Sequence, residues 1–139
     1  MKNLKLIKGL FVIMVTLLTN SCQEDELNFQ ENFPFEVMVM PVREEIEIGQ
    51  TAEIRVSIQT AEEYLDTDYF IRYFQYEGFG ELRYYDNEPY LPNDLYPLEE
   101  KEFRLYYTSQ SEDTQDFSIW ISDNFGNEKK IDFQFKNES

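Results

Sequence analysis

The sequence predicts an all-β protein: an immunoglobulin-like or fibronectin-III-like β-sandwich of seven or eight antiparallel strands. Apolar and polar residues alternate with a period of two along short segments, so each segment has one face for a core and one for water. These segments recur about every ten residues with turn-forming residues between them, as in β-sandwiches. The only helical candidate, residues 60–65, is too short for more than about two turns.

Each expected strand is justified by its own alternation. One register carries mostly charged or polar residues and the other carries Phe, Val, Ile, Leu and Tyr, which suits a pleated, half-buried segment. Residues 68–77 are the exception, because aromatic side chains occupy both registers. In chain order, the expected strands are residues 33–39, 45–48, 52–58, 68–77, 81–85, 102–108, 117–121 and 131–135.

Turn residues separate these segments. Gly49-Gln50 makes one turn, and residues 123–127 supply the Asn and Gly that tolerate positive φ in a hairpin loop. Residues 86–99 contain three prolines, which cannot donate hydrogen bonds to a sheet. That stretch is therefore either a long crossing loop or a frayed sheet edge. The cysteine pair of antibody domains is absent, so the fold prediction depends on the pattern alone.

The N-terminus has the order of a bacterial lipoprotein leader. Three lysines precede an apolar run of nine residues, much shorter than the ~20 that a membrane-spanning helix needs. Ser21 then precedes Cys22, the only cysteine, which we expect to become the lipid-bearing terminus after cleavage. Lipoprotein leaders usually carry a leucine three positions before the cysteine, and here Thr19 occupies that position. The alternative interpretation is an ordinary signal peptide followed by a free cysteine. The expected regions are a signal peptide at 1–21, an acidic tether at 22–32 and the β-sandwich at 33–137.

An acidic run directly follows Cys22: Gln23, Glu24, Asp25 and Glu26. It resembles the export tag that sends Bacteroidetes lipoproteins to the outer face of the outer membrane. The resemblance implies a protein anchored in the outer membrane and exposed at the cell surface. The alternative is a plain solvated tether, which acidic runs usually are, with the domain facing the periplasm.

Charge limits the classes of partner. Loss of the leader would remove three lysines and leave nine basic residues against 28 acidic ones, a net charge of −19. Such a chain repels nucleic acid and anionic lipid headgroups, so we expect no nucleic-acid partner and bilayer contact only through acyl chains on Cys22.

Aromatic residues make up 17% of the chain, which a disordered acidic tail would lack, so a folded domain is expected.

The side chains present argue against catalysis. The sequence contains no histidine, which removes the usual general base of serine and cysteine enzymes and the imidazole metal ligand. Acylation of Cys22 would leave no thiol nucleophile. The carboxylates lie in runs or on the polar register of strands, where they are solvated and have ordinary acidity. We therefore predict a non-enzymatic protein without a cofactor or a metal site.

A calcium site is the alternative role for the acidic loops. Neither loop has the spacing of an EF-hand, and Asp and Asn in loops more often bond their own backbone as turn formers. The residues that offer oxygen ligands are Asp86, Asn87 and Glu88 in one loop and Asp123, Asn124 and Asn127 in the other.

Arginines recur beside aromatic residues and are candidates for partner binding. On neighbouring strands they could form a ladder of guanidinium groups over tyrosine rings, because Arg and Tyr are typical interface anchors. The same ladder could instead be cross-strand packing that stiffens the sandwich. Trp120 falls on the polar register of its strand, so it is either a core residue, if the register is shifted by one, or an exposed anchor. We favour a partly covered ring. The candidate residues are Arg72, Arg83, Tyr84, Tyr85, Tyr90, Arg104, Tyr106 and Trp120.

Several stretches together resemble the TraQ family of Bacteroidetes conjugative transposons. The resemblance covers nearly the whole chain and implies a small lipoprotein encoded among conjugal transfer genes, with an immunoglobulin-like β fold and no catalytic residues to carry over. The stretches are Leu91-Pro-Asn-Asp-Leu-Tyr-Pro-Leu-Glu99, Phe103-Arg-Leu-Tyr-Tyr-Thr-Ser109, Ile71-Arg-Tyr-Phe-Gln75, Asp123-Asn-Phe-Gly126, Pro34-Phe35 and Met40-Pro41-Val42.

These observations lead to three functional hypotheses. The first is a lipid-anchored outer-membrane interaction module of a conjugative transfer apparatus, which contacts other transfer proteins through the Arg/Tyr residues and the loop at 86–97. The second is a surface adhesin that stacks sugars on a coplanar platform of Tyr84, Tyr85, Tyr90 and Trp120. The third is a periplasm-facing scaffold, which differs from the first only in the leaflet that holds the anchor.

Overall fold

The computed structural model describes residues 34–138. The expected signal peptide, the lipidation site Cys22 and the acidic run Gln23 to Glu26 all lie outside the described residues. Within them no helix is long and apolar enough to cross a membrane.

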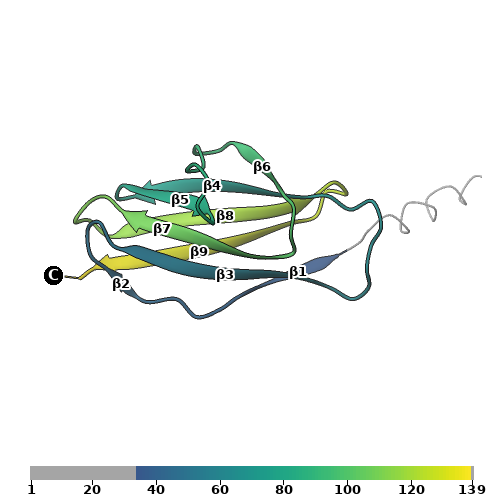
Figure 1. Ribbon diagram of the computed structural model, residues 1–139, viewed down its shortest axis with the longest axis horizontal. Helices are drawn as coiled ribbons and strands as arrows, with labels where there is room; N and C mark the ends of the chain where they lie inside the picture. The colour runs from purple at the N-terminus through teal and green to yellow at the C-terminus, as the bar shows by residue number, and fades with distance from the viewer. Residues whose placement is uncertain (1–33, 139) are drawn as a thin grey trace, which may run out of the picture. The chain divides into compact units, whose positions relative to one another are not determined.

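Two β-sheets make up the described domain, which confirms the all-β sandwich (Figure 1). One sheet has four strands in the order β1-β3-β7-β5, and the other has five in the order β2-β9-β8-β4-β6. The strands are β1 Phe35–Val39, β2 Glu45–Ile46, β3 Thr51–Thr60, β4 Tyr69–Glu77, β5 Gly80–Tyr84, β6 Leu95–Leu98, β7 Glu102–Ser109, β8 Gln115–Asp123 and β9 Glu128–Asn137.

The strand pairing is antiparallel except at one edge, where the two-residue β2 pairs with β9 in parallel. The helical candidate at 60–65 is wrong, because β3 runs to Thr60 and bends follow. The proline-rich stretch ends in an edge strand, β6, which pairs only with β4. An edge strand needs no donor on its free side, so Pro97 is tolerated there.

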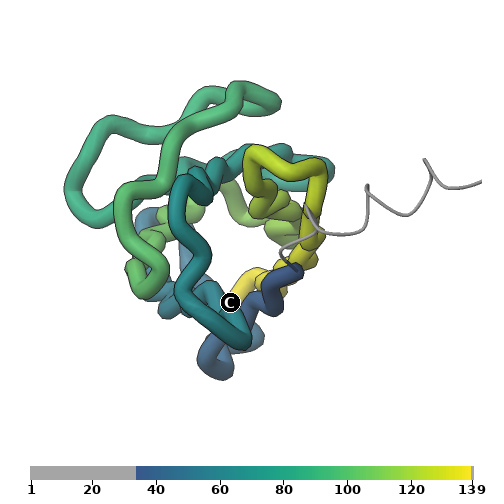
Figure 2. Tube along the Cα trace, turned by 90° about the vertical axis from the view of Figure 1, so that its right-hand side faces the viewer, coloured from purple at the N-terminus to yellow at the C-terminus, as the bar shows by residue number. Residues whose placement is uncertain are grey.

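The core lies between the two sheets and is built from the apolar register of each strand. Because no disulfide joins the sheets, stability depends on packing. Aromatic rings dominate it: Tyr107 stacks on Phe117 at a ring-centroid distance of 4.2 Å, and Phe117 lies 5.1 Å from Phe133. Figure 2, viewed along the strands, shows the sheets enclosing this interior while the segment between β5 and β6 extends beyond it.

A buried polar network closes one end of the core. Gln115 is fully buried and accepts a hydrogen bond from the Tyr107 hydroxyl at 2.6 Å, while its Nε2 donates to Ser111 Oγ at 3.0 Å. Gln75 Nε2 donates to the Tyr107 hydroxyl at 2.8 Å, and the Tyr73 hydroxyl donates to Gln75 Oε1. Satisfied networks of this kind fix a single core arrangement. Here the network attaches the turn before β8 to strands of both sheets.

Candidate functional site

The candidate partner-binding residues are divided between opposite sides of the sandwich. Arg83 and Arg104 lie on β5 and β7 of the four-stranded sheet, whereas Arg72 and Trp120 lie on β4 and β8 of the five-stranded sheet. The single ladder expected from the sequence therefore does not form. The reason is topological: β4 and β5 are consecutive in the chain, but the turn at Gly78 passes from one sheet to the other.

Three of the chain's five arginines lie on the outer face of the four-stranded sheet. We call this surface the arginine face and define it by Arg55, Arg83, Arg104, Tyr85 and Tyr106. Arg55 faces Arg104 directly across β3 and β7, and Tyr106 is the register partner of Arg83. The face gathers most of the arginines of a chain whose formal net charge is −16, and it also carries three glutamates, Glu53, Glu81 and Glu102.

Glutamates on the same face partly neutralise the arginines. Glu53 Oε1 lies 2.6 Å from Arg55 Nε and 3.7 Å from Arg104 Nε, and Glu81 Oε2 lies 2.7 Å from Arg83 Nη2. The hydrogen bond from Arg55 lowers the pKa of Glu53, and that from Arg83 lowers the pKa of Glu81. Both carboxylates therefore stay ionised, which is the opposite of what a general acid needs.

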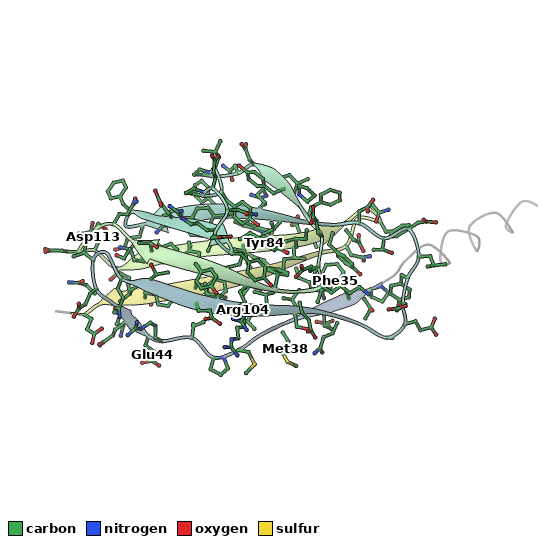
Figure 3. All side chains as sticks on the ribbon, viewed as in Figure 1. Phe35, Met38, Glu44, Tyr84, Arg104 and Asp113 are labelled. Carbon is green, nitrogen blue, oxygen red and sulfur yellow. The ribbon has the colours of Figure 1, made fainter. Side chains whose placement is uncertain are left out.

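A groove of about 330 Å³ opens on the arginine face. Arg55 and Arg104 line it together with Met38 and Met40, whose side chains are about half exposed. In Figure 3 Met38 points away from the sandwich on the side of β1. The remaining lining residues are Val56, Ser57, Tyr85, Glu102 and Phe103.

Tyr85 forms one wall of this groove in a strained backbone conformation. Its φ is 51°, in the left-handed region that bulky residues rarely adopt. Its N–H donates to the Arg104 carbonyl at 3.1 Å, and its ring packs edge-on against Tyr84 at 4.8 Å. Backbone strain of this kind is often concentrated at functional sites.

Tyr84 and Tyr90 are partly covered by neighbouring rings, and both line a separate hollow of about 330 Å³ between β5 and β6. The Tyr84 ring lies 5.6 Å from Phe103, and its hydroxyl is buried without a hydrogen-bond partner among the described residues. Tyr90 packs against Tyr96 at 4.7 Å, and burial raises its pKa. With Trp120 on the opposite sheet, these rings do not form the coplanar platform that a sugar-binding adhesin requires.

Trp120 lies at the centre of a second surface, the outer face of the five-stranded sheet. The Arg72 guanidinium carbon is 3.9 Å from the ring centroid, and Lys130 Nζ approaches from the strand on the other side at 5.7 Å. Phe74 and Tyr76 form an edge-on pair beside this row at 5.1 Å. Trp120 is partly covered, and the cations occupy space where a sugar would stack.

Several residues of both surfaces are not evident from the sequence pattern. Met38, Arg55 and Lys130 occupy polar-register positions, which identifies them as outward-facing without indicating which of them lie together. The signal that could have identified the second surface, around Trp120, is at residues 70–76, where aromatic residues fill both registers.

The described residues contain no cluster of three His, Cys, Asp or Glu side chains arranged to hold a metal ion. In the loop at 123–127 the buried Asp123 carboxylate instead accepts hydrogen bonds from the backbone N–H groups of Phe125 and Asn127, both at 2.9 Å, and from Asn127 Nδ2 at 2.8 Å. This is the bonding of a turn former.

Asp123→Ala is expected to lower the free energy of unfolding by about 1–3 kcal/mol, because three donors lose their acceptor. Urea denaturation measures the loss, and the exposed Asp86→Ala is a control expected to change stability little. Millimolar calcium is expected to leave the melting temperature of the wild type unchanged. A rise in melting temperature with calcium, abolished by Asp123→Ala, would support the ion site instead.

Comparison with known proteins places this chain in a family. The family described as TraQ conjugal transfer protein matches residues 5–138. This chain belongs to that family. The resemblance inferred from the sequence motifs is therefore confirmed, and with it a conjugation-related role for this TraQ-family chain.

Three solved structures resemble this TraQ-family chain at 42–43% identity. A conjugative transposon lipoprotein from Bacteroides eggerthii has a TM-score of 0.71, with 76% of this chain and 100% of that chain covered. A lipoprotein from Bacteroides thetaiotaomicron has a TM-score of 0.72 over 84% and 90%. A conjugate transposon protein from Bacteroides vulgatus has a TM-score of 0.68 over 76% and 86%. No match was found among curated proteins.

Proposed function

We propose that this chain is a non-enzymatic interaction module of a conjugative transfer apparatus, held on the outer membrane by acyl chains on Cys22. The similarity to a conjugative transposon lipoprotein over the whole length of that protein carries the proposal. The chain's own leader and Cys22 agree with it. More than one acyl chain is needed for stable anchoring, and a fully processed lipoprotein terminus supplies it.

The arginine face is the proposed contact surface for other transfer proteins. Arg, Tyr and Met are enriched at protein interfaces, and this face presents all three on a domain that is otherwise strongly acidic. The stretch at 86–97 begins beside it, where Asp86 lines a hollow with Tyr85 and Tyr106, and it ends in β6 of the other sheet. A non-catalytic role fits the ionised Glu53 and Glu81, which are bound to arginines.

Deletion of the gene from a transposon-bearing donor is expected to reduce transfer frequency, and the wild-type gene is expected to restore it. Cys22→Ala is expected to fail in complementation although the protein accumulates, because the variant cannot be acylated and so lacks its membrane anchor. A matched surface change, Leu65→Ala at a side chain that is 86% exposed, should complement fully. Unchanged transfer in the deletion strain would remove the conjugation role, and full complementation by Cys22→Ala would remove the anchor.

We propose that the acidic run Gln23, Glu24, Asp25 and Glu26 determines which side of the outer membrane the domain faces. It would direct export of the domain to the cell surface. Protease treatment of intact cells should then degrade the wild-type domain. Replacement of the three acidic residues by alanine should protect it. Protection of the wild type in intact cells would favour the periplasm-facing alternative.

A further inference from the structure

The groove on the arginine face has an incomplete set of ion pairs. Arg55 and Arg104 are directly opposite in the antiparallel register, and like charges in that position repel. Among the described residues one carboxylate, that of Glu53, lies within ion-pair distance of both, and it contacts each through Nε. The terminal guanidinium nitrogens of both arginines therefore keep their capacity for a second carboxylate. Both side chains are about half exposed, so that capacity is accessible.

Apolar and aromatic side chains flank the two arginines in the groove. Met38 and Met40 lie on one side with 51% and 53% of their surfaces exposed, and Tyr85 lies on the other. Methionine side chains are flexible and adapt to the shape of an apolar partner. The backbone of Tyr85 is in the left-handed region, which Asn or Gly would adopt more easily. A tyrosine at this position therefore costs conformational free energy.

We infer that this groove binds an extended segment of a partner protein, with an acidic side chain against Arg55 and Arg104 and apolar side chains against Met38, Met40 and Tyr85. The inference rests on the proposed function and names the chemistry of the partner. A carboxylate can receive two parallel N–H bonds from a guanidinium, which makes the contact specific as well as charged. Glu102 also lines the groove but forms no ion pair with a described residue, so the partner's carboxylate would join Glu53 as the second acid within ion-pair distance of the two arginines.

The lining favours a protein segment over a polyanion. Glu102 lines the groove two residues before Arg104, with no ion pair among the described residues, and it would repel a continuous run of negative charge. In an extended segment, side chains on one face are about 6.6–7 Å apart, so an acid can alternate with apolar residues that reach the methionines. A nucleic acid or sulfated glycan offers no such apolar neighbours.

The test uses the full-length protein in detergent micelles and a fluorescein-labelled peptide, Ser-Val-Ser-Glu-Ser-Val-Ser, with a Gln-for-Glu version as its counterpart. Fluorescence anisotropy is expected to show the Glu peptide binding about tenfold more tightly than the Gln peptide, the size of one charge-assisted contact. Arg104→Gln, which leaves the Arg55–Glu53 bond in place, should abolish that preference. Tyr85→Asn should weaken both peptides while the melting temperature is maintained.

Arg43→Gln is the matched control, because it removes the same charge from a residue paired with Glu138 outside the groove. It should leave the preference for the Glu peptide unchanged. Equal binding of the two peptides to the wild type, or equal losses in Arg43→Gln and Arg104→Gln, would overturn the inference. Thermal melting of each variant shows whether a loss of binding is a loss of folding, and Arg55→Gln provides a second variant if Arg104→Gln is unfolded.

The transfer assay separates this inference from the proposed function. If the deletion strain loses transfer but the peptides bind without preference, the anchored role stands and the groove assignment fails. If the peptide preference follows the arginines but the deletion strain transfers normally, the groove assignment stands and the conjugation role fails.

Discussion

Gly80→Ala is expected to lower the free energy of unfolding by about 3 kcal/mol or more, at the upper end of the cost of overfilling a core. A Cβ at this position would lie 2.0 Å from the Tyr107 hydroxyl oxygen and 2.3 Å from its Cζ. Tyr107 cannot move aside easily, because it is fully buried, stacks on Phe117 and is hydrogen-bonded to Gln115. Urea denaturation followed by circular dichroism measures the loss.

Gly126→Ala is the matched control for this substitution. Gly126 has a φ of 89°, and no atom lies within 4 Å of the position that a Cβ would take. Alanine there is therefore expected to lower the free energy of unfolding only through the left-handed backbone, by about 1–2 kcal/mol. The difference between the two variants isolates the steric contact with Tyr107. Equal losses would show that β5 does not approach that ring so closely.

The strands can be predicted from the sequence because period-two alternation is a local signal. Residues 102–108 illustrate this: the alternation assigns Phe103, Leu105 and Tyr107 to one face, and all three are buried. Strand pairing is not predictable in the same way, because it depends on contacts between distant segments. β4 and β5 are joined by a short turn that suggests a hairpin, yet they lie in different sheets.

The candidate site depends on register, which the alternation pattern leaves undetermined. Arg104 stands out in the sequence because tyrosines follow it, whereas Arg55 does not, because its neighbours are Ile and Val. Only the pairing of β3 with β7 places the two arginines opposite each other. Trp120 shows the same limit: its outward position follows from alternation, but the cations beside it come from β4 and β9.

Stability is expected to fall steeply between about pH 10 and pH 12, because buried tyrosines resist ionisation in the folded state. Burial raises the pKa of Tyr107 to about 12 and also raises the pKa values of Tyr73 and Tyr90 above the ordinary value of 10. These groups contribute stability that is fully present below pH 10. It is lost as the unfolded chain releases protons that the folded chain retains.

The slope of that loss identifies the residues responsible. Each tyrosine that titrates only in the unfolded chain contributes about 1.4 kcal/mol per pH unit, so Tyr107→Phe should make the decline shallower by about that amount. Urea denaturation at intervals from about pH 8 to pH 11.5 measures the slope, and ultraviolet absorbance of tyrosinate counts the ionised tyrosines in each state. An unchanged slope in Tyr107→Phe would mean that Tyr107 ionises without unfolding, and its hydroxyl would then not be sealed within the network of Gln75 and Gln115.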